Sequence, residues 1–150
     1  MQPVQPAIDR GLTHVALPVS NLDRSIAFYE KYAQMQVVHR RLDPETRMGT
    51  AWVTDGTRPF VIVLLQVPVV EHPLLPMGHL GVACTSPEEV DQLSALAREE
   101  GCLRVAPRDL GPPIGYIAHL ADPDGHDLEL SYGQEVAYTV EHKIEEKLSV

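Results

Sequence analysis

The stretch that decides the fold is Asp122-Pro123-Asp124-Gly125-His126-Asp127-Leu128-Glu129-Leu130-Ser131-Tyr132. It opens with turn-forming residues, because Pro123 fixes φ at one turn position and Gly125 can take a positive φ. The residues that follow alternate in polarity, and the apolar face holds Leu128, Leu130 and Tyr132. This pattern predicts a hairpin turn that leads into a half-buried strand. Glu129 lies in the middle of the polar face, where a carboxylate must meet water, a partner group or a metal ion.

The first half of the chain reads as a strand, a helix and three further strands. Residues 13–19 alternate in polarity and predict a strand. Ser20 or Asn21, followed by the acidic Asp23, predicts a helix start, and apolar residues at helical spacing carry the helix to about residue 34. Three more strands are predicted from the runs at residues 37–42, 49–54 and 60–67.

The same pattern restarts after a proline-rich linker at residues 69–76. Residues 79–84 predict a strand, and Ser86-Pro87 predicts the start of a helix that ends at Gly101. A short strand at 103–106, a loop at 108–115 and a hairpin built from 116–121 and 126–132 complete this half. The tail at residues 135–150 is mixed in charge and is compatible with a helix or a strand.

The chain therefore contains two copies of one βαβββ unit, which predicts an α+β fold. When the copies are superposed, His14 falls on His79 and Val63 falls on Glu129. Three of these four positions carry side chains that ligate metals. Their apolar neighbours point to the other face, so we expect the three side chains to lie on the sheet faces that the helices do not cover.

Three stretches resemble signature sequences of the vicinal oxygen chelate superfamily, which includes glyoxalase I, extradiol dioxygenases and bleomycin-binding proteins. They are Thr-His-Val-Ala-Leu with the helix start after it (13–29), Gly-His-Leu-Gly-Val (78–82) and the Asp-Pro-Asp-Gly stretch (122–130). The resemblance implies two βαβββ modules, at about residues 11–68 and 77–133, whose mixed sheets curve around a metal cleft. We therefore expect one domain at residues 11–134, after a loose segment at 1–10 and before the tail.

The resemblance also implies a set of metal ligands, because His14, His79 and Glu129 fall on ligand positions of the superfamily. Val63 falls where members like glyoxalase I carry a fourth ligand, usually Glu. A site with two imidazoles, one carboxylate and open positions suits a divalent metal ion, with Fe2+ or Mn2+ favoured and Zn2+, Ni2+ or Co2+ as alternatives. Gln66 has the wrong strand parity to replace the missing ligand.

His119 is the candidate catalytic base, because it lies on the strand before Glu129 and its parity directs it into the cleft. An imidazole is suited to proton transfer near neutral pH, although a purely structural role is an equal alternative. In extradiol dioxygenases a tyrosine takes this position, and their additional upstream histidine is absent here. Tyr116 has the opposite parity and is expected to pack under the second helix. His126 is expected to be solvated at its turn.

These features favour a metal-dependent, dioxygenase-like enzyme that acts on a small substrate chelated through adjacent oxygens. A glyoxalase I-like lyase or epimerase is one alternative. A metal-free binding protein of the bleomycin-resistance type is another, although it predicts loss of the ligands that this chain retains. Small, apolar cleft residues do not single out a substrate.

Composition excludes several other classes of protein. The net charge is −9 and no dense Lys/Arg patch occurs, which argues against nucleic acid and anionic membranes as partners. No apolar run could span a bilayer, and the start lacks the pattern of a signal peptide. Cys84 and Cys102 form no C-x-x-C pair, and we expect Cys84 to be core and Cys102 half-buried. We expect a cytoplasmic protein, and the resemblance implies a homodimer.

Overall fold

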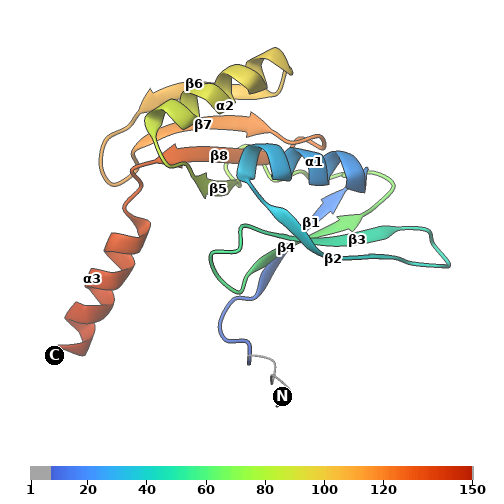
Figure 1. Ribbon diagram of the computed structural model, residues 1–150, viewed down its shortest axis with the longest axis horizontal. Coiled ribbons are helices and arrows are strands. Elements are labelled where there is room, and N and C mark those ends of the chain that lie inside the picture. Colours follow the sequence, from blue (N-terminus) through green and yellow to red (C-terminus); the bar gives the residue numbers. More distant parts are fainter. Residues whose placement is uncertain (1–7, 150) are drawn as a thin grey trace, which may run out of the picture. The chain divides into compact units, whose positions relative to one another are not determined.

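The computed structural model describes residues 8–149, so residues 1–7 of the expected loose segment lie outside the described residues. The chain divides into two compact units, residues 1–72 (unit 1) and 73–150 (unit 2). Each contains one βαβββ module, and within each module the helix lies on one face of the sheet (Figure 1). The predicted fold class, α+β with two βαβββ modules and mixed sheets, is confirmed.

Unit 1 contains a four-stranded mixed sheet and one helix. Its elements are β1 (His14–Val19), α1 (Leu22–Ala33), β2 (Gln36–Leu42), β3 (Gly49–Thr54) and β4 (Val61–Gln66). The strand order is β1-β4-β3-β2, with β1 parallel to β4 and the other pairs antiparallel.

Helix α1 is fixed at its start by the side chain of Asn21, whose Oδ1 accepts a hydrogen bond from the Arg24 backbone N at 3.0 Å. Its buried face packs on β3 and β4. The residues of that core include Leu22, Ile26, Tyr29, Ala51, Val53, Ile62 and Leu64. Side chains alternate along a β-strand, so every second side chain of these strands lies on the opposite face of the sheet, away from α1.

Unit 2 repeats this arrangement and adds a helix. Its elements are β5 (Leu80–Ala83), α2 (Pro87–Glu99), β6 (Leu103–Asp109), β7 (Tyr116–Ala121), β8 (Asp127–Tyr132) and α3 (Val136–Leu148). The strand order is β5-β8-β7-β6, with β5 parallel to β8. The Ser86 Oγ accepts from the Glu89 backbone N at 3.1 Å and caps α2. As expected, Tyr116 faces this helix, and its hydroxyl donates to Asp91 Oδ1 at 2.5 Å.

The two modules share one register, as the sequence repeat requires. Ala16 pairs with Val63 between β1 and β4, and Gly81 pairs with Glu129 between β5 and β8. The turn before β8 has the predicted form, with Gly125 at φ +90° and its backbone N bonded to the Asp122 carbonyl. Val63 and Glu129 therefore occupy equivalent positions in their own sheets.

Strand β6 is longer than the sequence indicated. We expected it to end at Ala106, but it continues through Pro107 to Asp109. Proline is tolerated here because β6 is an edge strand and its register with β7 shifts between Val105 and Arg108.

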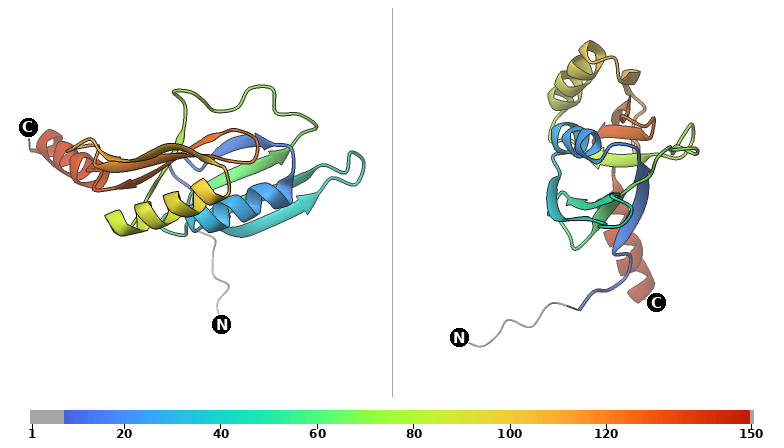
Figure 2. Two further views of the ribbon diagram at one scale, coloured as in Figure 1. Left: turned by 90° about the horizontal axis from the view of Figure 1, so that it is seen from above. Right: turned by 90° about the vertical axis from the view of Figure 1, so that its right-hand side faces the viewer.

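The tail forms a helix, α3, which was one of the two predicted possibilities. None of its residues is buried, and it projects beyond the unit 2 sheet (Figures 1 and 2). Across the part of the chain that the structure describes, no helix combines the length and apolar character needed to cross a membrane.

Candidate functional site

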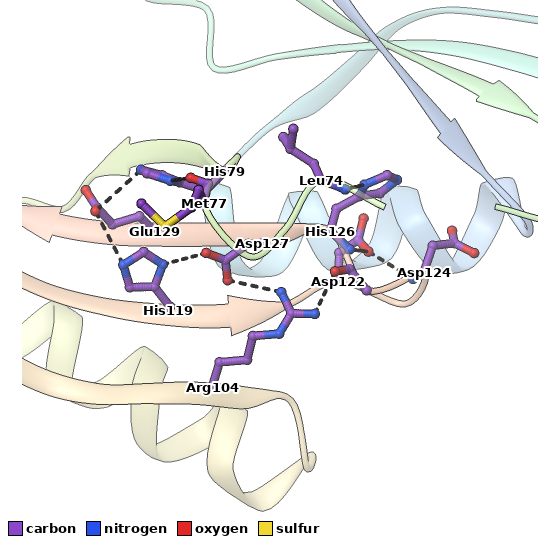
Figure 3. A network of polar contacts seen from close by, with 11 residues as sticks. Leu74, Met77, His79, Arg104, His119, Asp122, Asp124, His126, Asp127 and Glu129 are labelled. Carbon is purple, nitrogen blue, oxygen red and sulfur yellow. Dashed lines mark hydrogen bonds and ion pairs between the residues drawn. The ribbon is translucent and has the colours of Figure 1, made fainter. Parts of the chain in front are cut away.

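The face of the unit 2 sheet that α2 leaves uncovered contains a hollow of about 660 Å³. Its lining includes His79, His119, Asp127 and Glu129, which form a connected set of polar contacts (Figure 3). Leu75, Met77, Leu110, Ile114 and Ile117 supply apolar walls. A mostly apolar hollow with a few convergent polar groups is the usual form of a small-molecule site.

His79 lies immediately before β5 and is held in one tautomer by the backbone. Its Nδ1 is 2.9 Å from the Met77 carbonyl oxygen, which can only accept a hydrogen bond, so Nδ1 carries the proton. Nε2 is then left with a lone pair that faces Glu129 Oε2 at 3.7 Å (Figure 3). A hydrogen bond from one ring nitrogen to a backbone carbonyl commonly orients an imidazole that binds a metal ion through its other nitrogen.

Glu129 on β8 has a side chain that is only 9% exposed. Its Oε1 accepts a hydrogen bond from Gln134 Nε2 at 2.6 Å, which fixes the carboxylate plane. Its Oε2 lies 3.4 Å from His119 Nε2 and 3.7 Å from His79 Nε2. The carboxylate is therefore nearly buried, with one oxygen anchored and the other directed at two imidazoles.

His119 on β7 is oriented by a chain of ionic contacts. Its Nδ1 is 2.7 Å from Asp127 Oδ2, while Asp127 Oδ1 is 3.1 Å from Arg104 Nη1. Arg104 Nη2 also donates to the Gly125 carbonyl at 2.6 Å. Because Nδ1 donates to Asp127, the Nε2 of a neutral His119 presents a lone pair toward Glu129.

The donor chemistry of this cluster fits a cation. When both imidazoles are neutral, the Nε2 atoms of His79 and His119 turn lone pairs toward the Glu129 oxygen, and acceptors that face one another are unfavourable unless positive charge lies among them. A cation such as a divalent metal ion or a proton meets this need. Within residues 8–149, no group of three His, Cys, Asp or Glu side chains has the geometry of a complete metal site.

The third predicted ligand, His14, belongs to unit 1. It begins β1, is exposed, and has its Nδ1 2.9 Å from Thr13 Oγ1. His14 and Val63 both line a hollow on the unit 1 sheet. The structure thus brings His79, Glu129 and His119 together in unit 2 and places His14 in unit 1.

The environments of Gln66 and His126 were also predicted from the sequence. Gln66 is not directed to a ligand position, because its Oε1 accepts from the Gly49 backbone N at 2.9 Å. His126, which we expected to be solvated, is 1% exposed, so that prediction is wrong. Its Nδ1 accepts from the Leu74 backbone N at 2.9 Å and joins the linker to the turn (Figure 3).

Sequence reasoning did not find Gln134, Asp127 and Arg104 as parts of the site. Asp127 could have been found, because it lies two residues before Glu129 on the same strand face. Gln134 lies beyond the end of β8 and Arg104 lies on a strand with shifted register, so neither carries a periodic signal.

The fold and the site together indicate one class of protein. The fold has two βαβββ modules with matched registers, and the site has a His–Glu pair on the sheet face that α2 leaves uncovered. The chain belongs to the Glyoxalase/Bleomycin resistance protein/Dioxygenase superfamily, whose family model matches residues 11–130. This confirms the resemblance to the vicinal oxygen chelate superfamily. Members of this superfamily are mostly metal-dependent enzymes, and they bind small molecules.

Individual relatives span most of the chain. An uncharacterised protein of Pseudomonas aeruginosa is 39% identical over 126 residues, which cover 82% of this chain and 89% of that protein. Lactoylglutathione lyase of Salmonella typhimurium is 30% identical over 124 residues, covering 79% of this chain and 90% of the lyase. The lactoylglutathione lyase of Arabidopsis thaliana is longer, and the chain spans 44% of its length.

Solved structures show the same fold at lower identity. The trypanothione-dependent glyoxalase I of Leishmania major has a TM-score of 0.70 and 24% identity, with 95% of this chain and 100% of that chain covered. The fosfomycin resistance protein FosX of Listeria monocytogenes, in complex with Mn(II), has a TM-score of 0.67 and 18% identity, with coverages of 89% and 99%. At least one protein that shares this fold, FosX, thus binds a divalent metal ion.

Proposed function

We propose that this protein is a divalent-metal-dependent enzyme in which His14, His79 and Glu129 hold the metal ion. The observation that carries the proposal is the convergence of the His79 and His119 Nε2 atoms on the half-anchored Glu129 carboxylate. The pattern of two imidazoles and one carboxylate suits Fe2+ or Mn2+, and Zn2+, Ni2+ and Co2+ remain alternatives. His14 completes the set from the same chain or from a second copy in a homodimer.

The reaction best supported is proton transfer next to a chelated oxygen, as in a glyoxalase I-like lyase or an epimerase. A bound divalent metal polarises the oxygen that it holds and makes the neighbouring C–H group acidic. His119 Nε2 accepts that proton, because its Nδ1 proton is already donated to Asp127. Asp127 stabilises the imidazolium that forms, and Arg104 holds Asp127 in position. His119 then returns the proton to the adjacent atom of the substrate.

This preference differs from the one drawn from the sequence, which favoured a dioxygenase-like activity. The Asp127–His119 pair supports acid–base chemistry, and relatives at 30% identity carry the name lactoylglutathione lyase. The dioxygenase-like activity stays the second candidate, because Val63 leaves three ligands where glyoxalase I-like members have four. Metal-free binding of the bleomycin-resistance type ranks lower, since this chain retains the three ligand side chains.

The test compares two assays on full-length protein reconstituted with each metal ion. Isomerisation of hemithioacetals formed from thiols and 2-oxoaldehydes is expected, without O2 uptake on catechols. His119→Gln should lower kcat by roughly 10²-fold or more while metal content is unchanged, because general acid–base catalysis contributes that much. His142→Gln, on the exposed helix α3, is the matched control and should keep full activity.

Other results would point elsewhere. Oxygen uptake without isomerisation would favour the dioxygenase, and an unchanged kcat in His119→Gln would remove His119 from the mechanism. Mixing His14→Ala with His79→Ala protein distinguishes the two origins of His14. Recovered activity would mean that each site combines two chains, because one site of the mixed dimer would then carry neither change.

A further inference from the structure

The unit 1 sheet has its own hollow, of about 980 Å³, on the face that α1 leaves uncovered. The strand registers give the order of the side chains on that face. His14 is paired with Val61, Trp52 with Val63, and Thr50 with both Leu65 and Arg41. Successive rows on one face of a sheet lie about 7 Å apart along the strands. His14, Trp52 and Arg41 therefore belong to three successive rows of the same lining.

The middle row presents a flat aromatic surface. Trp52 is 42% exposed and its ring centroid lies 4.9 Å from that of His39, which is paired with it on β2. Val63 and Leu65 extend the apolar floor beside it. A large aromatic side chain left partly uncovered inside a hollow is suited to holding the apolar body of a ligand.

Two arginines that form no ion pair with a described carboxylate supply positive charge to the hollow. Arg41 on β2 and Arg58 in the turn before β4 both line the hollow. No described carboxylate lies within ion-pair distance of either guanidinium. In a chain with a net charge of −9, two such guanidinium groups in one hollow are complementary to an anionic ligand.

Asp9 is the one acidic residue in the lining, and no ion pair joins it to either arginine. The other acidic side chains near these arginines, Asp43 and Asp55, are engaged in their own turns. Asp43 Oδ1 accepts from the backbone N atoms of Glu45 and Thr46 at 2.9 and 2.8 Å. Those hydrogen bonds, chiefly the one from Thr46, lower the pKa of Asp43, and the charge of Arg41 adds a smaller effect. Arg41 therefore remains available to a ligand.

We propose that the unit 1 hollow binds a small organic carboxylic acid with a flat apolar body. The apolar body lies against Trp52, and Arg41 holds the carboxylate at the end of the hollow remote from His14. Only this orientation rests on the proposed function, because the proposed function places the metal-chelating oxygens of the ligand at the His14 end of the hollow. Binding of the carboxylate itself requires no metal ion.

Trp52 is the only tryptophan in the chain, so its fluorescence reports on the hollow directly. Full-length protein treated with a chelator is titrated with 3-phenylpropionate and with the neutral 3-phenylpropanamide. The carboxylate should bind at least about tenfold more tightly, the ratio expected for one charge-assisted hydrogen-bonded pair. Arg41→Gln should remove this preference.

Arg40→Gln is the matched control, since Arg40 is the next residue on β2 but is paired with Asp23 of α1 at 2.7 Å. It should keep the preference for the carboxylate, and urea unfolding should show both variants to be folded. Three results would overturn the proposal: no quenching by the carboxylate in the millimolar range, equal binding of the amide, or equal behaviour of the two variants. Loss of the preference in Arg58→Gln but not in Arg41→Gln is one form of this third result, and it would assign the carboxylate to Arg58 instead.

A failure here is distinguishable from a failure of the proposed function. His79→Ala is expected to abolish metal binding and to leave the carboxylate titration unchanged, because His79 belongs to unit 2. A protein that binds metal but not the carboxylate would refute this inference alone.

Discussion

Hydrogen bonds to the ring nitrogens distinguish the two histidines of the candidate site, His79 and His119, from the buried His126. In His79 and His119 the Nδ1 atom donates to a carbonyl or carboxylate oxygen, so Nε2 faces the hollow with a lone pair. In His126 the Nδ1 atom accepts from the Leu74 backbone N. The sequence could not reveal this difference, because the residues around His126 predict a turn whether or not its side chain is buried against the linker.

The role of His126 predicts a loss of stability on substitution. His126→Ala removes the acceptor of a part-buried backbone N–H group, which should lower the free energy of unfolding by about 1–3 kcal/mol. Urea denaturation measures the change. His142→Ala, on exposed α3, should stay within about 0.5 kcal/mol of the wild type. Equal stability of the two variants would show that the Leu74 contact contributes little.

Cys84 was predicted to lie in the core, but the structure shows it half-buried. The pKa of its thiol is raised to about 11, mainly by burial and to a smaller extent by the negative charge of Glu89. Only the thiolate reacts with alkylating reagents, so the fraction available at pH 8 is small. The rate of iodoacetamide labelling at Cys84, followed by mass spectrometry, should keep rising beyond pH 9. A plateau near pH 9 would contradict the raised pKa. Cys102→Ser protein isolates the signal.

At the scale of elements, helix boundaries were the most predictable feature. Ser86 caps α2 as expected, and Asn21 rather than Ser20 caps α1. Both helices start at residues whose side chains accept a backbone N–H, which is a local property. The extension of β6 was not predictable, since it depends on edge position and a register shift with β7.

Helix α3 makes a separate prediction about stability. It buries no residue, so removing residues 136–150 should change the free energy of unfolding by less than about 1 kcal/mol. Truncation after Glu135 keeps the hydrogen bond from its backbone N to the Pro113 carbonyl. A loss of several kcal/mol in urea denaturation would mean that α3 packs against another surface, such as a second copy of the chain.

At the scale of the whole molecule, most of what the sequence predicted about the fold came from the internal repeat. The match of His14 with His79 and of Val63 with Glu129 anticipated two modules in one register, and the strand pairings agree. The His79–Glu129 pair followed from the same match. Gln134 and Arg104, which orient the site, could not be predicted, because their contacts depend on the loop after β8 and on the bulged edge strand.

The most direct test of the account is the metal content of full-length protein purified without chelators, measured by elemental analysis. Wild type and the control His142→Ala should contain stoichiometric divalent metal. His79→Ala and Glu129→Gln should lose it, and Glu129→Gln retains an oxygen that can accept from Gln134, so its fold should persist. Metal retained in both ligand variants, or absent from the wild type even after reconstitution, would contradict the proposed metal centre.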